Sequence, residues 1–468
     1  MPDYDVIVLG GGSAGTSAAR AAAEAGAKTA MVNDGELGGL CILRGCMPTK
    51  AMLASAHALH EAEHLDPFGV HLEGRVVPQF ERIMERKNSQ VQRFKRAKVA
   101  NIEAADYELI KGRARFTAGG TMQVDGRTLT AGRSVIATGS IPSMLPIPGL
   151  DQATVLTSDK VMGLRSAPKS IVVQGAGAVG LELAQFFARI GTQVLMVNRS
   201  PLLSHSDLEC GQELRRALED EPRFDLAIPG KIEEILGDGS GSIFKIRCGE
   251  NLRKHHAEAL LMAVGREAAL GDLGLEHVGL QPENGRLSHD ASMRTSKPDI
   301  FVAGDATGCH QILHLANQEG RIAGYNAAVG GPEKKMDYRM KMSVIFTDPP
   351  FAQVGATEAE AKESGRAYAV GQARFPETGR AITMEAKHGV WKVLVDRESG
   401  EIIGSAILGP RADDLIHLIS LMMHYHGQAQ DIPGLPWYHP TLSEVMLNIA
   451  GDLARSLPQS IAACEPPA

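Results

Sequence analysis

The hydrophobic pattern near the start of the chain predicts alternating strands and helices. Asp5 to Leu9 form an apolar run that is typical of a buried parallel strand, and a glycine-rich turn follows at residues 10–15. The alanine-rich stretch from Thr16 to Ala25 predicts a helix that ends at Gly26, and residues 28–32 predict the next strand. This order is that of a βαβ nucleotide-binding unit.

A second unit of the same kind begins after residue 170. Its strand, loop, helix and strand are expected over residues 171–174, 175–180, 181–190 and 193–197. Such an internal repeat implies that one chain binds two nucleotides.

The connecting segments carry further patterns. Helices are expected from Pro48 to about His60 and over residues 79–100, and short strands lead to residues 134–139. The proline-rich stretch over residues 141–149 is typical of a linker.

In the last part of the chain the pattern of polar and apolar residues predicts a different kind of structure. Thr295 to Asp305 predicts a strand followed by a turn. From Ser343 onward, antiparallel strands with two amphipathic helices predict a separate C-terminal domain. Because 468 residues are too many for one core, two to four domains are expected.

Composition narrows the class of partner. The formal charge is −7 with both signs scattered, so no basic stripe exists to bind nucleic acid. No apolar run is long enough to span a bilayer. The first strand begins almost at the initiator methionine, which leaves no room for a signal peptide and leads us to expect a cytoplasmic protein, where structural disulfides are rare.

Two of the six cysteines, Cys41 and Cys46, have only four residues between them. The alternatives are a redox pair, half of a zinc site, or two buried thiols. No second Cys/His cluster lies nearby in the sequence, and Cys46 lies just before a helix start, where the helix dipole stabilises a thiolate. We therefore favour a redox role. The isolated cysteines are Cys210, Cys248, Cys309 and Cys464.

The two glycine-rich loops predict two dinucleotide sites. In each loop the glycines let the backbone approach a pyrophosphate at a helix N-terminus. The acidic residue expected after the second strand is replaced by Asn33, with Asp34 next, in the first unit, and by Asn198, with Arg199 next, in the second. The missing carboxylate and the adjacent Arg199 favour NADPH over NADH in the second site, although a solvent-facing arginine explains Arg199 nearly as well.

Near the other end, His439 is followed by Pro440 and, five residues after the histidine, by Glu444. A histidine held by a carboxylate can protonate a leaving thiolate and deprotonate an incoming thiol. The following histidines have no such company in the sequence and are assigned no chemistry: His205, His255, His256, His424 and His426.

With these residues assembled, the chain resembles the class I pyridine nucleotide-disulfide oxidoreductase family, the group of dihydrolipoamide dehydrogenase, glutathione reductase and mercuric reductase. The likeness extends nearly from end to end. It implies an α/β fold with two Rossmann-like nucleotide-binding domains and a C-terminal α+β dimerisation domain. The implied division is residues 1–150 and 284–340 for the two parts of the FAD domain, 151–283 for the NAD(P)-binding domain, and 341–468 for dimerisation.

The resemblance also assigns roles to residues. Cys41 and Cys46 are implied to form the redox disulfide, and Lys50 is implied to lie by the flavin and pair with Glu182. Residues implied to contact FAD are Gly10, Gly12, Ser13, Ala14, Gly15, Asn33, Asp34, Gly39, Lys50, Ala114, Thr138, Gly139, Asp305, Gln311, Ile312, Leu313 and His314. Residues implied to contact NADPH or NADH are Gly175, Gly177, Val179, Gly180, Glu182, Asn198, Arg199, Ile232, Gly265 and Arg266. No metal is expected.

The implied mechanism carries hydride from NAD(P)H through FAD to the Cys41–Cys46 disulfide, and on to a small disulfide or dithiol. Cys46 stays as a thiolate beside the flavin, while Cys41 attacks the substrate and forms a mixed disulfide that Cys46 resolves. His439 of the partner subunit, oriented by Glu444, moves the proton, so the resemblance implies a homodimer with the active site across its interface. Such an enzyme acts in cell redox homeostasis.

Some residues depart from the family pattern. Leu40 and the run Leu43-Arg44-Gly45 stand where family members commonly carry other residues around the thiols, and Trp437 and Tyr438 precede the histidine in place of a small residue. Aromatic residues there predict a narrowed substrate cleft. The tail has only Cys464, without the vicinal pair typical of mercuric reductase.

Dihydrolipoamide dehydrogenase-like chemistry is the leading hypothesis. The alternatives are a glutathione-type reductase of low-molecular-weight disulfides, a mercuric reductase-like metal-ion reductase, and a non-catalytic redox-sensing flavoprotein subunit.

Overall fold

The structure is a computed structural model that describes residues 1–331 and 333–457. The chain forms two compact units, each assembled from segments that are separate in the sequence. The first unit contains Met1–Ala51, Met84–Ser143 and Gly265–Asp337; the second contains Met52–Ile83, Met144–Val264 and the residues from Tyr338 onward. The boundary between the first and second units after Ser143 lies within the linker expected over residues 141–149. The four-part domain division stays a prediction.

The first unit is built around a parallel sheet in the order β18-β7-β1-β2-β3. Val6, Ile7 and Val8 in the central strand are fully buried, as an apolar run in a parallel sheet requires. The predicted strand, helix and strand at the N-terminus are confirmed, although the helix begins earlier than expected. The strands are β1 (Tyr4–Leu9), β2 (Thr29–Asn33), β3 (Glu108–Lys111), β7 (Ala131–Ile136) and β18 (Ile300–Val302).

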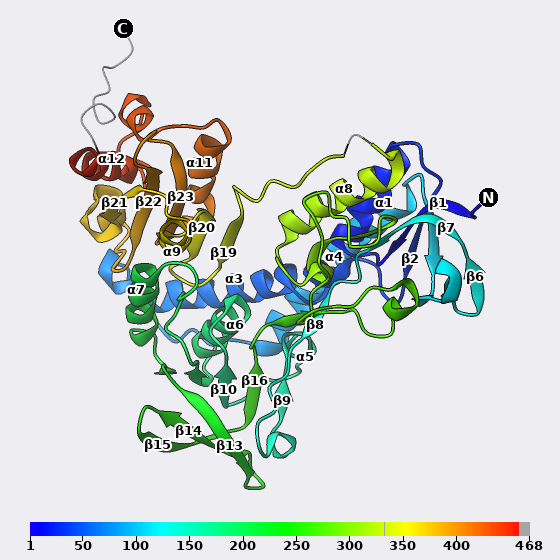
Figure 1. Ribbon diagram of the computed structural model, residues 1–468. Helices are drawn as coiled ribbons and strands as arrows, with labels where there is room; N and C mark the ends of the chain where they lie inside the picture. Colours follow the sequence, from blue (N-terminus) through cyan, green and yellow to red (C-terminus); the bar gives the residue numbers. More distant parts are fainter. Residues whose placement is uncertain (332, 458–468) are drawn as a thin grey trace. The chain divides into compact units, whose positions relative to one another are not determined.

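Two helices of this unit, α1 (Ser13–Glu24) and α8 (Leu313–Val329), lie side by side (Figure 1). Their close approach depends on glycine: a Cβ on Gly320 would lie 2.2 Å from the carbonyl oxygen of Ala14, and one on Gly324 would lie 2.0 Å from that of Ala18. The long helix α4 (Phe80–Glu103) confirms the helix expected over residues 79–100.

Short antiparallel strands complete the first unit. One sheet contains β4 (Ala114–Phe116), β5 (Met122–Val124) and β6 (Arg127–Leu129), and a ribbon pairs β8 (Ser140–Pro142) with β17 (Arg266–Ala268). Helix α3 (Cys46–Glu63) begins in the first unit and continues in the second.

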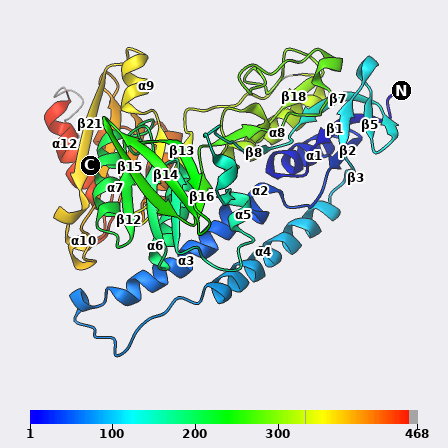
Figure 2. The same cartoon turned by 90° about the horizontal axis from the view of Figure 1, so that it is seen from below.

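The second unit contains a parallel sheet in the order β12-β11-β10-β16-β9. Helix α6 (Ala178–Arg189) follows β10 after the second glycine-rich loop, so the predicted repeat is confirmed. Its strands are β9 (Val155–Leu156), β10 (Ser170–Gln174), β11 (Gln193–Val197), β12 (Phe224–Ala227) and β16 (Ala259–Met262), and its other helices are α5 (Ser158–Val161) and α7 (Leu208–Glu219). The antiparallel strands β13 (Lys231–Gly237), β14 (Ser242–Cys248) and β15 (Asn251–Ala257) lie next to one another (Figure 2).

The C-terminal part of the second unit is an antiparallel sheet in the order β19-β20-β23-β22-β21 with helices beside it. This confirms the prediction of antiparallel strands and helices from about residue 343 onward. Trp391 and Phe375 are fully buried and stacked in its core. The strands are β19 (Met342–Ile345), β20 (Phe351–Gly355), β21 (Tyr368–Arg374), β22 (Val390–Asp396) and β23 (Ile402–Leu408); the helices are α9 (Glu358–Glu363), α10 (Gly379–Thr383), α11 (Ala412–His424) and α12 (Val445–Ser456).

Candidate active site

The two thiols lie on consecutive helices of the first unit. Cys41 belongs to the short helix α2 (Gly39–Leu43), and Cys46 is the first residue of α3. Both are free thiols, partly buried, and their side chains are close enough to share a hydrogen bond. This hydrogen bond, burial and repulsion from Cys46 together raise the pKa of Cys41, which disfavours a negative charge on both sulfurs at once.

The helix that carries Cys46 begins two residues earlier than the sequence predicted. Pro48 was expected to open it, but proline is tolerated throughout a first turn, where its missing N–H has no partner to lose. Cys46 therefore lies on the first turn rather than before it. The sequence also gave no sign of α2, because five residues are too few for a periodic pattern.

A close backbone contact fixes the segment that carries the thiols. Gly39 has φ of +73°, and a Cβ placed on it would lie 2.8 Å from the Cα of Gly12. Only glycine allows this approach, because any side chain at residue 39 meets the backbone of the first glycine-rich loop. The thiol segment therefore rests directly on that loop.

The first glycine-rich loop has the features of a dinucleotide cradle. Gly10 has φ of +110°, and a Cβ on Gly15 would lie 1.8 Å from the Gly10 carbonyl oxygen. No side chain caps the N-terminus of α1, which begins at Ser13, so its N–H groups are available to an anion. Within the described residues the buried Oγ1 of Thr138 has no hydrogen-bond partner. These features fit the diphosphate and polar groups of FAD.

Asn33 has a role that the sequence did not suggest. Its Oδ1 accepts a hydrogen bond from the N–H of Gly11 (2.9 Å), and its Nδ2 donates one to the Gly35 carbonyl (3.0 Å). The amide thus holds the glycine-rich loop in place. Asp34 is exposed. A ribose contact at either residue stays a prediction.

The other residues expected at FAD form a connected polar group. Asp305 Oδ2 accepts a hydrogen bond from the Ser140 hydroxyl (2.6 Å), and Arg266 donates from Nε to the same hydroxyl oxygen (2.8 Å). Gln311, at the approach to α8, donates to the Arg266 carbonyl (2.9 Å). Arg266 belongs to the first unit, and its predicted contact with NAD(P) stays a prediction. Ala114 is buried, so only its backbone can reach a nucleotide. The remaining predicted contacts of this region are Gly139, Ile312, Leu313 and His314.

The second glycine-rich loop repeats the first. Gly175 has φ of +105°, and a Cβ on Gly180 would lie 2.1 Å from the Gly175 carbonyl oxygen. Asn198 Oδ1 accepts from the N–H of Ala176 (3.3 Å) and its Nδ2 donates to the Ser200 carbonyl (2.6 Å), as Asn33 does in the first unit. The loop residues Gly177 and Val179 and the exposed Arg199 stay predicted coenzyme contacts, as does Gly265, which lies in the first unit. Ile232 is 3% exposed within an apolar core, which leaves only its backbone to reach a ligand.

Glu182 lies on α6 and is 3% exposed. Its Oε1 accepts a hydrogen bond from the N–H of Phe346 (3.0 Å), at the end of β19. Lys50 lies in the first unit and Glu182 in the second, and their predicted pairing stays a prediction.

The structure brings His439 and Glu444 together. His439 Nδ1 lies 2.9 Å from Glu444 Oε2, and the peptide bond between His439 and Pro440 is cis. The imidazole is 78% exposed, whereas the carboxylate is 17% exposed, so the carboxylate is fixed and the ring faces outward. Beside them, Tyr438 is 81% exposed, and Trp437 packs against the core of the C-terminal sheet.

Comparison with known proteins places this geometry in a family. Residues 4–329 match the pyridine nucleotide-disulphide oxidoreductase family, and residues 342–450 match the dimerisation domain of these oxidoreductases. The chain belongs to this family. The predicted family, fold class and enzyme class are thereby confirmed.

Similar proteins of this oxidoreductase family carry two activities in their names. A dihydrolipoyl dehydrogenase of Chlorobaculum tepidum is 32% identical over 461 residues, which cover 97% of this chain and 98% of that protein. A mercuric reductase of Bacillus cereus is 32% identical over 426 residues, 90% of this chain and 67% of that protein. The HOCl-induced flavoprotein disulfide reductase RclA from Escherichia coli has the same fold, with a TM-score of 0.83, 24% identity, and coverage of 96% of this chain and 99% of that one.

The protein is therefore an NAD(P)H-dependent flavoprotein disulfide oxidoreductase, and FAD and a pyridine nucleotide are its cofactors. Its C-terminal part is a dimerisation domain. Across residues 1–331 and 333–457, no helix of this oxidoreductase is long and apolar enough to cross a membrane. Over the same ranges no group of three metal-ligating side chains is assembled. Cys464 lies outside the described residues.

Two histidines of this oxidoreductase have carboxylate partners that the sequence hid. His256 Nε2 lies 3.0 Å from Asp238, and His426 Nδ1 lies 2.8 Å from Glu401. The expectation that these two histidines have no carboxylate partner was wrong. The partners were missed because each of them lies far away in the sequence. Both pairs are on the surface, where an ion pair contributes little to stability.

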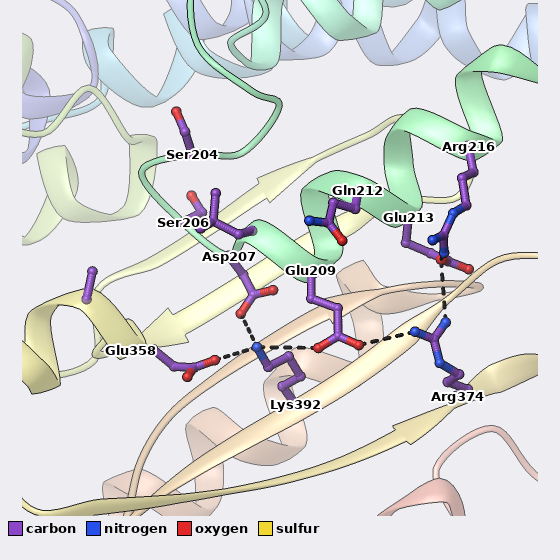
Figure 3. A pocket seen from close by; sticks show the side chains of 12 residues that line it. Ser204, Ser206, Asp207, Glu209, Gln212, Glu213, Arg216, Glu358, Arg374 and Lys392 are labelled. Atoms are coloured by element: carbon purple, nitrogen blue, oxygen red, sulfur yellow. Dashed lines mark hydrogen bonds and ion pairs between the residues drawn. The ribbon is translucent and has the colours of Figure 1, made fainter.

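A polar pocket of about 440 Å³ lies between α7 and the C-terminal sheet and contains none of the predicted site residues. Lys392 in its wall is 8% exposed and lies 2.8 Å from Asp207 and 3.8 Å from Glu209, and it also contacts Glu358 (Figure 3). Burial disfavours the ammonium, but the hydrogen bonds to Asp207 and Glu358 outweigh this and raise the pKa of Lys392. Because the charged side chains of its wall are paired with one another, we interpret the pocket as a structural ion-pair network.

A second ion-pair cluster surrounds Arg189 at the end of α6. Its guanidinium, 3% exposed, contacts Glu221 at 2.5 Å, Asp348 at 3.0 Å and His57 at 2.7 Å. Burial opposes ionisation of Asp348, but His57 and Arg189 hold its pKa well below the ordinary value. This cluster ties α3 to α6 and to the turn after β19.

Proposed function

We propose that the chain uses Cys41 and Cys46 as a redox disulfide that passes two electrons from NAD(P)H to a small disulfide, or accepts them from a dithiol, in the manner of dihydrolipoamide dehydrogenase. The observation that supports this most is the position of the two thiols. They lie within hydrogen-bonding reach of each other, at a helix N-terminus, on a segment packed against the first glycine-rich loop.

In this proposal Gly10–Gly15, Thr138 and Asp305 would hold the FAD, which when bound would supply the disulfide with two electrons from NAD(P)H. These electrons break the Cys41–Cys46 bond and leave Cys46 as a thiolate, stabilised by the N-terminus of α3. The Cys41 sulfur attacks the substrate disulfide, forms a mixed disulfide and releases one thiol. The Cys46 sulfur then attacks Cys41, which reforms the protein disulfide and releases the second thiol.

The proton is moved by His439 of the partner subunit. Within its own chain the imidazole is exposed and held by Glu444, an arrangement suited to a base that serves another surface. The active site is then shared across a homodimer.

Anaerobic titration with NADPH tests the redox pair. We expect a long-wavelength band from a thiolate beside the oxidised flavin, and its loss in Cys46→Ser. If the wild-type protein binds FAD and is reduced without ever showing this band, the proposal for Cys41 and Cys46 is wrong.

Subunit mixing tests the shared site. Cys41→Ser and His439→Gln homodimers are each expected to have almost no activity. Random exchange between them gives half heterodimers, each with one intact site, so about a quarter of wild-type activity should return. No recovery after proven exchange contradicts a site across the interface.

We propose NADPH as the preferred coenzyme. Asn198 offers no carboxylate to repel a 2′-phosphate, and the exposed Arg199 follows it. The ratio of kcat/KM for NADPH to that for NADH should fall about tenfold in Arg199→Glu. It should not change in Arg253→Glu, which alters an exposed arginine on β15. A wild-type ratio below one refutes the preference, and equal ratios in the wild type and Arg199→Glu refute the role of Arg199.

A metal-ion reductase is the second candidate, favoured by the relatives named mercuric reductase, two of which are 32% and 33% identical to this chain. A steady-state screen of lipoamide, glutathione disulfide and Hg(II) separates the candidates. Stimulation of NADPH oxidation by Hg(II) alone supports metal-ion reduction, and stimulation by a disulfide alone supports our proposal. We place the protein in the cytoplasm, which cell fractionation can test.

A further inference from the structure

Lys98, on α4, is a half-buried cation beside the first glycine-rich loop. Its Nζ donates to the Thr16 hydroxyl oxygen (2.7 Å), and that hydroxyl in turn donates to the Gly12 carbonyl (2.8 Å). In the part of the chain that the structure describes, no carboxylate lies within ion-pair distance of Lys98. The ammonium therefore lies on the first turn of α1 with no carboxylate of the described residues as its counter-ion.

This arrangement is unfavourable by itself. Burial lowers the pKa of Lys98, and repulsion from Arg20, one turn further along α1, lowers it again. A buried cation without an anionic partner destabilises a fold, and such groups are usually paired. An anion beside Lys98 would therefore stabilise the charged form of this lysine.

Cys41 can supply that anion. Helix α2, which carries it, begins at Gly39, and Gly39 packs against Gly12 on the same turn of α1 that Lys98 reaches. Attraction to the Cys41 sulfur favours the charged form of Lys98. Electrostatic coupling is reciprocal, so Lys98 must favour the thiolate of Cys41 by the same free energy.

We propose that Lys98 stabilises the thiolate of Cys41 and so determines how much of this sulfur is reactive at neutral pH. The role of Cys41 as the attacking thiol rests on the proposed function; its pairing with Lys98 does not. Other groups act on the same sulfur. Cys46 opposes its ionisation and Lys50 favours it, both from α3, while Arg44 ends α2 and Arg20 lies beside Lys98.

The test is the pH dependence of alkylation. The holoenzyme is reduced with dithiothreitol and treated with iodoacetamide, and tryptic peptides are quantified by mass spectrometry. Cleavage after Arg44 places Cys41 and Cys46 on different peptides, so each thiol is followed separately. In Lys98→Met the alkylation of Cys41 near pH 7 should slow about threefold or more, with its profile displaced to higher pH.

Two variants serve as controls. Lys98→Arg should restore the wild-type profile, and Arg96→Met, at an exposed position on the same helix, should leave it unchanged. Because Lys98→Met removes an unpaired buried charge, its thermal midpoint should equal or exceed that of the wild type.

A Cys41 profile that is identical in wild type and Lys98→Met overturns the proposal. So does a lowered thermal midpoint with unchanged reactivity, which assigns Lys98 a purely structural role. Because the protein is reduced chemically, this outcome does not depend on electron transfer from NAD(P)H. Failure of the proposed function and failure of the Lys98 proposal are therefore distinguishable.

Discussion

His60 makes the stability of the second unit depend on pH. It lies on α3 near the Arg189 cluster, with Nδ1 4.0 Å from Glu221 and its side chain 27% exposed. Burial, the Arg189 charge and the neighbouring His64 lower the pKa of His60 from 6.5 to about 4. The folded protein therefore keeps this ring neutral where the unfolded chain already binds a proton.

The sign and size of the effect follow from linkage. Between pH 6.5 and 4 the unfolded state binds more protons, so stability is complete above pH 6.5 and falls as the pH drops toward 4. The full pKa difference corresponds to about 3 kcal/mol, and the part lost between pH 7 and pH 5 is about 2 kcal/mol. His60→Gln cannot take up this proton, so it should lose about 2 kcal/mol less than the wild type over that interval.

Urea unfolding at several pH values, followed by tryptophan fluorescence, measures this. Both tryptophans, Trp391 and Trp437, lie in the second unit, so the signal reports the unit that contains His60. His71→Gln, at an exposed position of the same unit, is the matched control and should keep the wild-type pH slope. If His60→Gln also keeps that slope, the reasoning about His60 is refuted.

Three further predictions concern other parts of the molecule. Lys392→Met should destabilise the protein by about 3–5 kcal/mol in urea unfolding, because Asp207, 6% exposed, loses its counter-ion; Asp207→Asn in addition should recover most of the loss, and failure to recover contradicts the pairing. Asn33→Ala leaves the Gly11 N–H without its acceptor and should weaken FAD retention during dialysis by roughly tenfold, whereas unchanged retention argues against the loop-holding role. His439→Gln should lower disulfide turnover by roughly 100-fold or more while reduction of the flavin by NADPH in stopped flow stays fast; equal slowing of both steps contradicts a role in proton transfer.

The sequence predicted the parts of the fold that are governed by local rules. Apolar runs gave β1 and β10, and the glycine spacing gave both loops, because contacts as close as that of Gly15 with Gly10 leave no alternative residue. The pairing of His439 with Glu444 was also predictable, since only four residues lie between them.

Contacts between distant segments could not be read in this way. Arg189 contacts His57 and Asp348, each more than a hundred residues away in the sequence. The sequence around each of these residues gives no indication of the other two. The asparagines at the ends of β2 and β11 were interpreted only as replacements of an expected acidic residue, because a side chain that bonds to a loop backbone leaves no periodic signal. The sequence did not single out Lys98 for the same reason, because it is one of several basic residues on a surface helix.

The contact between Gly12 and Gly39 has a practical consequence for protein engineering. A chimera that takes the thiol segment from a relative takes only one of the two backbone segments that pack against each other. The donor sequence must bring a glycine at position 39, because a Cβ there would lie 2.8 Å from the Cα of Gly12. A larger residue at position 39 would push the thiol segment away from the glycine-rich loop, so the two segments should be grafted as one block.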